Sequence, residues 1–97
     1  MSIQIKKDQW VYVVIQDPGT NPQYLGQHED DTGISFIPVF LEKDDALMCM
    51  NLMARDKKQP SEVQAVLYEE LTGHAAVSGF KLYLLNKTGE VLEKISP

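Results

Sequence analysis

The sequence is poor in cysteine, in positive charge and in long apolar runs, and each shortage narrows the classes of protein to consider. Cys49 is the single cysteine among 97 residues, so no disulfide can form within the chain and a reducing compartment is expected. The chain has 9 lysines and arginines against 14 aspartates and glutamates, which gives a net charge of −5. This charge disfavours nucleic acids and anionic membranes as partners, because both are bound through positive charge.

No apolar run approaches the length of a membrane span, and residues 1–7 lack the apolar core of a signal peptide. We therefore expect a cytoplasmic protein. The length fits a single domain, 1–97, in which residues 1–8 form a loose polar lead-in. The sequence shows no metal-ligand spacing and no glycine pattern for phosphate binding. We expect no cofactor, no bound metal and no catalytic residues.

The most apolar stretch, residues 33–54, predicts a buried strand that leads directly into a helix. Ile34–Leu41 is a continuous apolar run, which is typical of a central strand covered on both faces. Pro38 cannot donate to a sheet ladder, so we place it at a bulge or where a neighbouring strand ends. The predicted helix covers residues 43–56, because charged residues suit the two ends of its dipole. The acidic residues at its start are Glu42, Asp44 and Asp45, and the basic residues at its end are Arg55, Lys57 and Lys58.

Alternating apolar residues and turn signals predict the other elements. Strands are expected at 10–15, 23–27, 62–67, 80–85 and 90–95, and a second helix at 68–78. The proline- and glycine-rich residues 17–22 predict a loop, and residues 86–89 predict a hairpin turn. The sum is an α+β fold, a single-domain mixed sheet of about five strands with two helices on one face.

One segment resembles a known family. Phe36-Ile37-Pro38-Val39-Phe40, the acidic helix start and Ala46-Leu47 resemble the strand-to-helix segment of SseB-like proteins, which are small bacterial α/β domains. The layout from Val63 to Leu85 is also similar to a domain of unknown function found in cyanobacteria and plastids. The SseB-like pattern commonly has a small hydroxyl residue at the helix start, where this chain has Glu42. Neither family has an established biochemical activity, so the resemblance implies a fold and carries over no functional residue.

Three groups of residues are candidates for function. The methionine-rich helix could present an adaptable docking surface, with Met48 and Leu52 as the candidate interaction residues, or these side chains could belong to the core. A ligand site could lie beside the 17–22 loop, lined by residues that share aromatic or polar character: Trp10, Tyr24, Asp17 and Asn21. His28 and the acidic residues 29–31 could chelate a metal weakly, but a solvated acidic turn is the preferred interpretation. Cys49 is interpreted as a buried structural thiol.

The leading hypothesis is a non-catalytic protein-binding or adaptor domain, whose partner is another protein or a second copy of the chain. The alternative is a small-ligand sensor with a pocket near the Asp17–Pro22 loop. An enzyme that uses the cluster from His28 to Asp31 ranks last, because a catalytic site needs several convergent polar groups.

Overall fold

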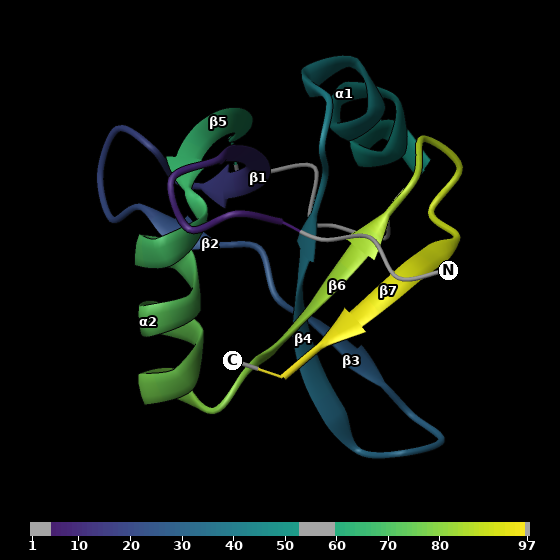
Figure 1. The fold of residues 1–97 in the computed structure, drawn as a ribbon. Helices are drawn as coiled ribbons and strands as arrows, with labels where there is room; N and C mark the ends of the chain where they lie inside the picture. The colour runs from purple at the N-terminus through teal and green to yellow at the C-terminus, as the bar shows by residue number, and fades with distance from the viewer. Residues whose placement is uncertain (1–4, 53–59, 97) are drawn as a thin grey trace.

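A computed structural model describes residues 5–52 and 60–96 of the chain. These residues form two helices and seven strands in two sheets (Figure 1). The elements in chain order are β1 (Trp10–Gln16), β2 (Gln23–Tyr24), β3 (Gln27–Glu29), β4 (Ile34–Val39), α1 (Lys43–Leu52), β5 (Ser61–Leu67), α2 (Tyr68–Ser78), β6 (Lys81–Leu85) and β7 (Val91–Ile95). The predicted α+β class is confirmed. The prediction of one sheet of about five strands is corrected, because the strands divide into the sheets β2-β1-β5 and β3-β4-β6-β7.

The two sheets meet where β1 passes the end of β4. The Tyr12 N–H donates to the Phe40 carbonyl at 2.8 Å, and the Phe40 N–H donates to the Tyr12 carbonyl at 2.9 Å. The segment between β2 and β3 also crosses this junction, where the Leu25 N–H donates to the Val14 carbonyl at 2.8 Å. These contacts join residues far apart in sequence, so no local pattern could have predicted them.

The helices lie on opposite sides of the parallel pair β4 and β6, not on one face as predicted (Figure 1). Both faces of these strands are apolar, and successive side chains point to opposite faces, so each face needs its own cover. The α2 residues Leu71 and Ala75 join one core cluster, together with Val11, Val13, Ile15, Ile37, Val39, Leu82 and Leu84. The α1 residues Ala46 and Cys49 join the other, together with Phe40, Tyr83 and Leu85.

Pro38 lies where a neighbouring strand ends, which is one of the two predicted alternatives. The register from Phe36 to Val39 against β6 is continuous, and the pairing with β3 stops at Phe36. The backbone groups of Phe40 point away from β6, towards Tyr12. Because these groups alternate along a strand, those of Pro38 point the same way, towards the side that β3 has left. The missing N–H of proline therefore costs no sheet hydrogen bond.

The second helix has the predicted bounds, and Gly79 ends it in the left-handed conformation with φ of 79°. The first helix is described up to Leu52, and residues 53–56 of the prediction lie outside the described residues. The predicted loose lead-in falls partly on residues 1–4, which are also outside them. Ile5 packs against the core, and the Glu69 N–H donates to the Lys7 carbonyl at 3.1 Å. In the ranges 5–52 and 60–96, no helix is both long and apolar enough to cross a membrane.

Candidate functional site

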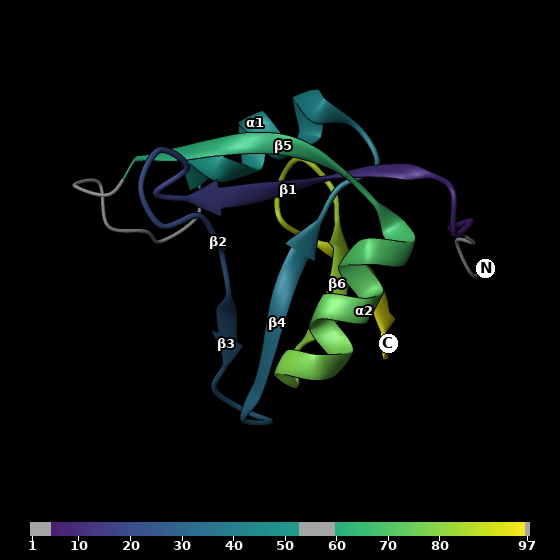
Figure 2. The same cartoon turned by 90° about the vertical axis from the view of Figure 1, so that its left-hand side faces the viewer.

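The outer edge of β5 is the candidate functional site. Strand β5 contains seven residues and is the last strand of its sheet, because β1 lies on its inner side (Figure 2). Figure 2 shows it near the top of the molecule, with β1 below it and α1 behind and partly above it. A strand in this position can offer backbone hydrogen-bonding groups to another chain.

The hydrogen bonds of β1 establish which backbone groups of β5 are paired. Tyr12 and Val14 bond on the side away from β5, to Phe40 and Leu25. Backbone groups alternate sides along a strand, so the other residues of β1 are the ones that bond to β5. These are Val11, Val13 and Ile15, whose partners in the register are Val66, Gln64 and Glu62.

The N–H and C=O groups of Val63 and Ala65 therefore point outward, away from β1. Within the part of the chain that the structure describes, these groups have no hydrogen-bond partner. The strand contains no proline, lysine or arginine, and Glu62 is its single charged residue. Natural proteins usually protect an exposed edge with such residues, with bulges or with a very short strand. Among residues 5–52 and 60–96, nothing pairs with the outer edge of β5, and its own sequence carries none of the usual protecting residues except Glu62.

Helix α1 packs over β1 and β5, close to this edge. Ala46 and Cys49 face the core, whereas the side chains of Met48 and Leu47 are 54% and 38% exposed. The alternative that Met48 belongs to the core is therefore wrong. Leu52 ends the helix, and its side chain lies outside the described part of the structure. Met48 thus remains a candidate for contact with a partner.

Exchanging Met48 for glutamate is expected to leave the fold intact, since more than half of this side chain already faces solvent. The free energy of unfolding should change by at most about 0.5 kcal/mol, the usual range for surface substitutions. The matched change Ala46→Glu, at a fully buried position of the same helix, should prevent stable folding. Urea titration followed by circular dichroism measures both variants, and a Met48→Glu protein that unfolds like Ala46→Glu would contradict the assignment.

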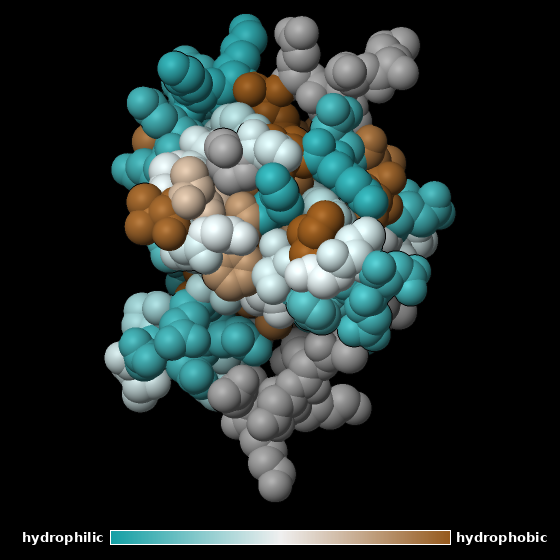
Figure 3. All heavy atoms as spheres, turned by 90° about the horizontal axis from the view of Figure 1, so that it is seen from below, coloured by the Kyte–Doolittle hydropathy of each residue, from teal (hydrophilic) through white to brown (hydrophobic). Residues whose placement is uncertain are grey.

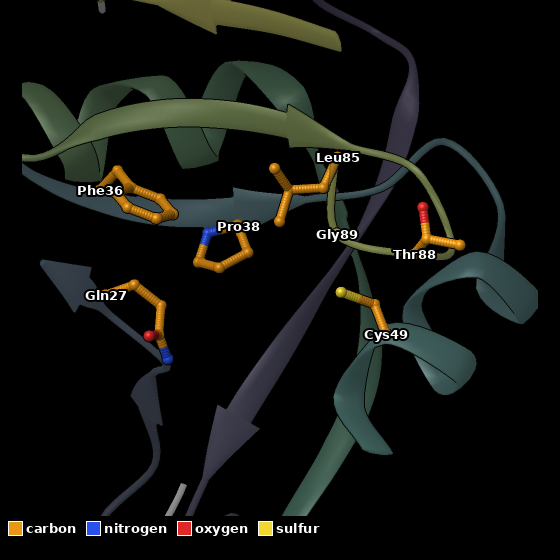
Figure 4. Close-up of a pocket in the computed structure, with 7 residues that line it drawn as sticks. All are labelled: Gln27, Phe36, Pro38, Cys49, Leu85, Thr88 and Gly89. Atoms are coloured by element: carbon orange, nitrogen blue, oxygen red, sulfur yellow. The ribbon is translucent and has the colours of Figure 1, made fainter. Parts of the chain in front are cut away.

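The Cys49 thiol points into a pocket of about 170 Å³ (Figure 4). The pocket is lined by Gln27, Phe36, Pro38, Leu85, Thr88, Gly89 and Cys49 itself. The thiol is buried, and burial raises its pKa above the ordinary value of 9.0. A nucleophilic cysteine needs a lowered pKa, so this environment disfavours thiolate chemistry. The interpretation of Cys49 as a buried thiol is confirmed.

The raised pKa of Cys49 makes the protein less stable at alkaline pH. The unfolded chain releases this thiol proton at a lower pH than the folded chain does, so folding keeps the proton bound. The stabilisation that comes from keeping the Cys49 thiol protonated is therefore complete below the ordinary thiol pKa. It is lost as the pH rises through the raised pKa of the folded protein. The free energy of unfolding of the wild type should fall more steeply over this range than that of Cys49→Ala. Equal slopes for the two proteins would contradict the expected pKa shift.

The predicted ligand residues do not meet in one site. A pocket of about 350 Å³ is lined by Pro22, Gln23, Tyr24, His74 and Phe80, of which sequence reasoning had identified only Tyr24 and the loop that contains Pro22. The Tyr24 and His74 rings lie 4.7 Å apart. Burial, and then the charge of Glu70, raise the pKa of Tyr24.

Trp10 lies far from this pocket, because it begins β1, whereas Tyr24 pairs with Ile15 near the end of that strand. Five residues of strand separate the two positions by about 17 Å. Asp17 adopts a positive φ of 53°, and Asn21 is exposed; neither is among the residues that line the pocket. Nothing in the sequence indicated that His74 of α2, and Phe80 just after the end of that helix, would line a pocket with Tyr24.

The residues from His28 to Asp31 lie on β3 and the turn that follows it. His28 Nδ1 is 3.4 Å from Ser35 Oγ, and Glu29 pairs with Lys94 at 3.7 Å. Among the side chains that the structure describes, no group of three histidine, cysteine, aspartate or glutamate residues could hold a metal ion. The first contact joins β3 to its neighbour β4, and the second reaches across the sheet from β3 to β7.

Comparison of the chain with models of protein families, with curated proteins and with solved structures gives no match. The resemblance to SseB-like proteins therefore stays an expectation.

Proposed function

We propose that this chain is a non-catalytic protein-binding domain, and that its partner adds an extended segment as a new strand beside β5. The observation that carries the proposal is the open edge at Val63 and Ala65, whose N–H and C=O groups point outward without partners among the described residues. Strand addition to such an edge is a recurring mode of peptide recognition, in which backbone hydrogen bonds supply affinity.

The expected affinity depends on the number of backbone donors and acceptors that the edge presents to a partner. Val63 and Ala65 together supply two donors and two acceptors, and each hydrogen bond contributes about 0.5–1.5 kcal/mol net. Additional affinity must come from side chains beside the edge, where Leu47 and Met48 of α1 are exposed. Seen from below in Figure 3, hydrophobic residues form separate spots among hydrophilic ones, without a continuous apolar patch on that face. This face lies on the side of the molecule opposite α1 and β5, which are at the top of Figure 1.

Replacing Ala65 with proline tests the proposal, because proline removes one outward donor and leaves the ladder to β1 complete. Ala65→Val is the matched control, since it alters the same exposed position and keeps the N–H. Tagged wild type and both variants would be used to capture partners from the cells that produce the protein. Proline should abolish capture and valine should preserve it, with both variants folded by circular dichroism.

Hydrogen exchange of the captured complex gives the decisive measurement. The Val63 and Ala65 amides should exchange fast in the free chain and slowly in the complex. A partner that binds Ala65→Pro as well as the wild type, or that leaves both amides unprotected, would contradict strand addition.

A second candidate function is the binding of a small ligand in the hollow beside β2, which is favoured by its size of about 350 Å³ and its aromatic lining. Pockets for small molecules usually measure about 300–1,000 Å³ and have mostly apolar walls with a few polar groups. A ligand there should raise the melting temperature of the wild type, and the exposed His74 provides a variant, His74→Ala, in which the rise should shrink. A metabolite screen with equal shifts for both proteins would contradict this second function.

A further inference from the structure

We infer that the strand added to β5 is β5 of a second copy of this chain, so that two three-stranded sheets join into one six-stranded sheet. This inference rests on the proposed function and names its partner. A sheet of six strands is within the usual size. Two features of the structure support a second copy, namely the symmetry of the edge itself and the position of α1 beside it.

The edge of β5 is complementary to itself. A two-fold axis perpendicular to the sheet pairs residues of the two strands antiparallel, and the full overlap of Ser61–Leu67 places Gln64 on the axis. In this register Val63 of each copy faces Ala65 of the other. These are the residues whose backbone groups point outward, so the register of full overlap is also one that hydrogen-bonding allows. Four hydrogen bonds form across the axis.

The side chains in this register are also compatible. Glu62, the single charged residue of the strand, faces Val66 of the other copy, so no like charges are opposed. The two Gln64 side chains face each other on the axis, where each amide can donate to the other. A slip of the pairing by four residues in one direction would place Glu62 on the axis, opposite its own copy. Electrostatic repulsion therefore disfavours that register and helps to select the one centred on Gln64.

The position of α1 gives the second argument. The helix packs over both β1 and β5. A two-fold axis perpendicular to the sheet would place its copy on the same face of the joined sheet. Strands lie about 4.8 Å apart, so a helix seated over β1 and β5 has its axis about 5 Å from the two-fold axis. The two α1 helices then lie about 10 Å apart, a distance at which helices pack directly.

The exposed apolar residues of α1 are suited to this contact. Leu47 and Met48 are consecutive, so they lie about 100° apart around the helix, each about 130° from the centre of the face that Ala46 and Cys49 bury. Their exposed apolar side chains therefore project from the outer half of the helix, one of them on the side from which the copy approaches. The same two-fold axis thus pairs the open strand edges and covers apolar surface that the single chain leaves exposed.

Light scattering coupled to size exclusion tests the inference on the purified chain. The wild type and Ala65→Val should have twice the mass of the chain, and Ala65→Pro should have the mass of one chain. A folded wild type that is monomeric throughout the accessible concentration range would overturn the inference.

Cysteine cross-linking tests the register in a Cys49→Ala background. Gln64→Cys places two thiols opposite each other at a position without backbone bonds, where Cα atoms are about 4.5 Å apart and a disulfide can form. Glu62→Cys is the matched control on the same strand, and its two thiols would lie about 13 Å apart. Air oxidation should give a covalent dimer of the first variant and not of the second. A dimer that cross-links equally in both variants, or in neither, would overturn the proposed pairing.

The two proposals fail in different ways. A monomeric chain that captures a different protein, with protection of the Val63 and Ala65 amides, contradicts the second-copy inference and supports strand addition. A monomeric chain whose captured proteins never protect these amides contradicts both. A dimer that persists in Ala65→Pro shows that the copies associate through another surface, and it contradicts the inference while leaving strand addition to the capture experiment.

Discussion

Phe40→Ala is expected to destabilise the protein by about 3–5 kcal/mol, the usual cost of truncating a buried phenylalanine. Phe40 is fully buried in the cluster under α1, with Tyr83 and Leu85. Its backbone exchanges two hydrogen bonds with Tyr12 at the point where the two sheets meet. The truncation therefore leaves a cavity at the junction of the sheets. Small domains have a total stability of about 5–15 kcal/mol, so the loss could exceed half of it.

Urea unfolding followed by circular dichroism measures the loss for Phe40→Ala. The control is Trp10→Ala, which also removes a large aromatic ring, but one that is 57% exposed. The control should lose less than half as much stability, because less of its surface leaves water on folding. A loss below about 1 kcal/mol for Phe40→Ala, far under the usual cost of a large cavity, would contradict the packing described for the junction.

Leu71→Ala is expected to cost about 2–5 kcal/mol, because Leu71 is fully buried and its cavity cannot be filled from the small neighbour Ala75. These two residues are the buried residues of α2, so the leucine is the main attachment of the helix to the core. The loss should appear both in global stability and in the exchange rates of the helix amides. The exchange rates of the helix amides should rise because a weakly attached helix opens locally.

Val77→Ala is the matched control on the same helix. Val77 is 90% exposed, and alanine has the higher helix propensity, so stability should stay the same or rise slightly. If the two variants lost equal stability, the orientation of α2 on the sheet would be wrong.

Much of the secondary structure was predictable because its signals are local. Alternation of apolar residues predicted strands at 10–15 and 80–85, and the structure has them at Trp10–Gln16 and Lys81–Leu85. Helix α2 begins and ends where its acidic first turn and Gly79 indicated. The single strand predicted at 23–27 is two short strands, because Gln23–Tyr24 pairs with β1 whereas Gln27–Glu29 pairs with β4. The chain thus leaves one sheet and enters the other within this segment.

The division into two sheets was not predictable, because strand pairing depends on contacts distant in sequence. A strand–helix–strand unit favours a parallel neighbour, and β4 does have one. That neighbour is β6, whereas β5, the next strand along the chain, pairs antiparallel with β1. The two helices lie on opposite sides of β4 and β6 because the chain passes to the other sheet, through β5, between α1 and α2.

The candidate site was predicted only in part. Met48 of α1 was predicted to be available for contact, and its side chain is indeed exposed. Its contact with a partner stays a prediction. The open edge of β5 had no signal of its own, because an edge strand with apolar residues looks like an inner strand until its neighbours are known. The separation of Trp10 from Tyr24 likewise depends on the length and direction of β1.

Hydrogen exchange along β5 in a dilute solution, where the chain is monomeric, tests the open edge most directly. We expect an alternating pattern, in which the amides of Glu62, Gln64 and Val66 exchange slowly because they bond to β1, and those of Val63 and Ala65 exchange fast. Protection of Val63 and Ala65 should appear when the concentration is raised and copies associate. Equal and slow exchange of all five amides in the dilute monomer would show that the edge is already occupied, and it would contradict both strand addition and the second copy.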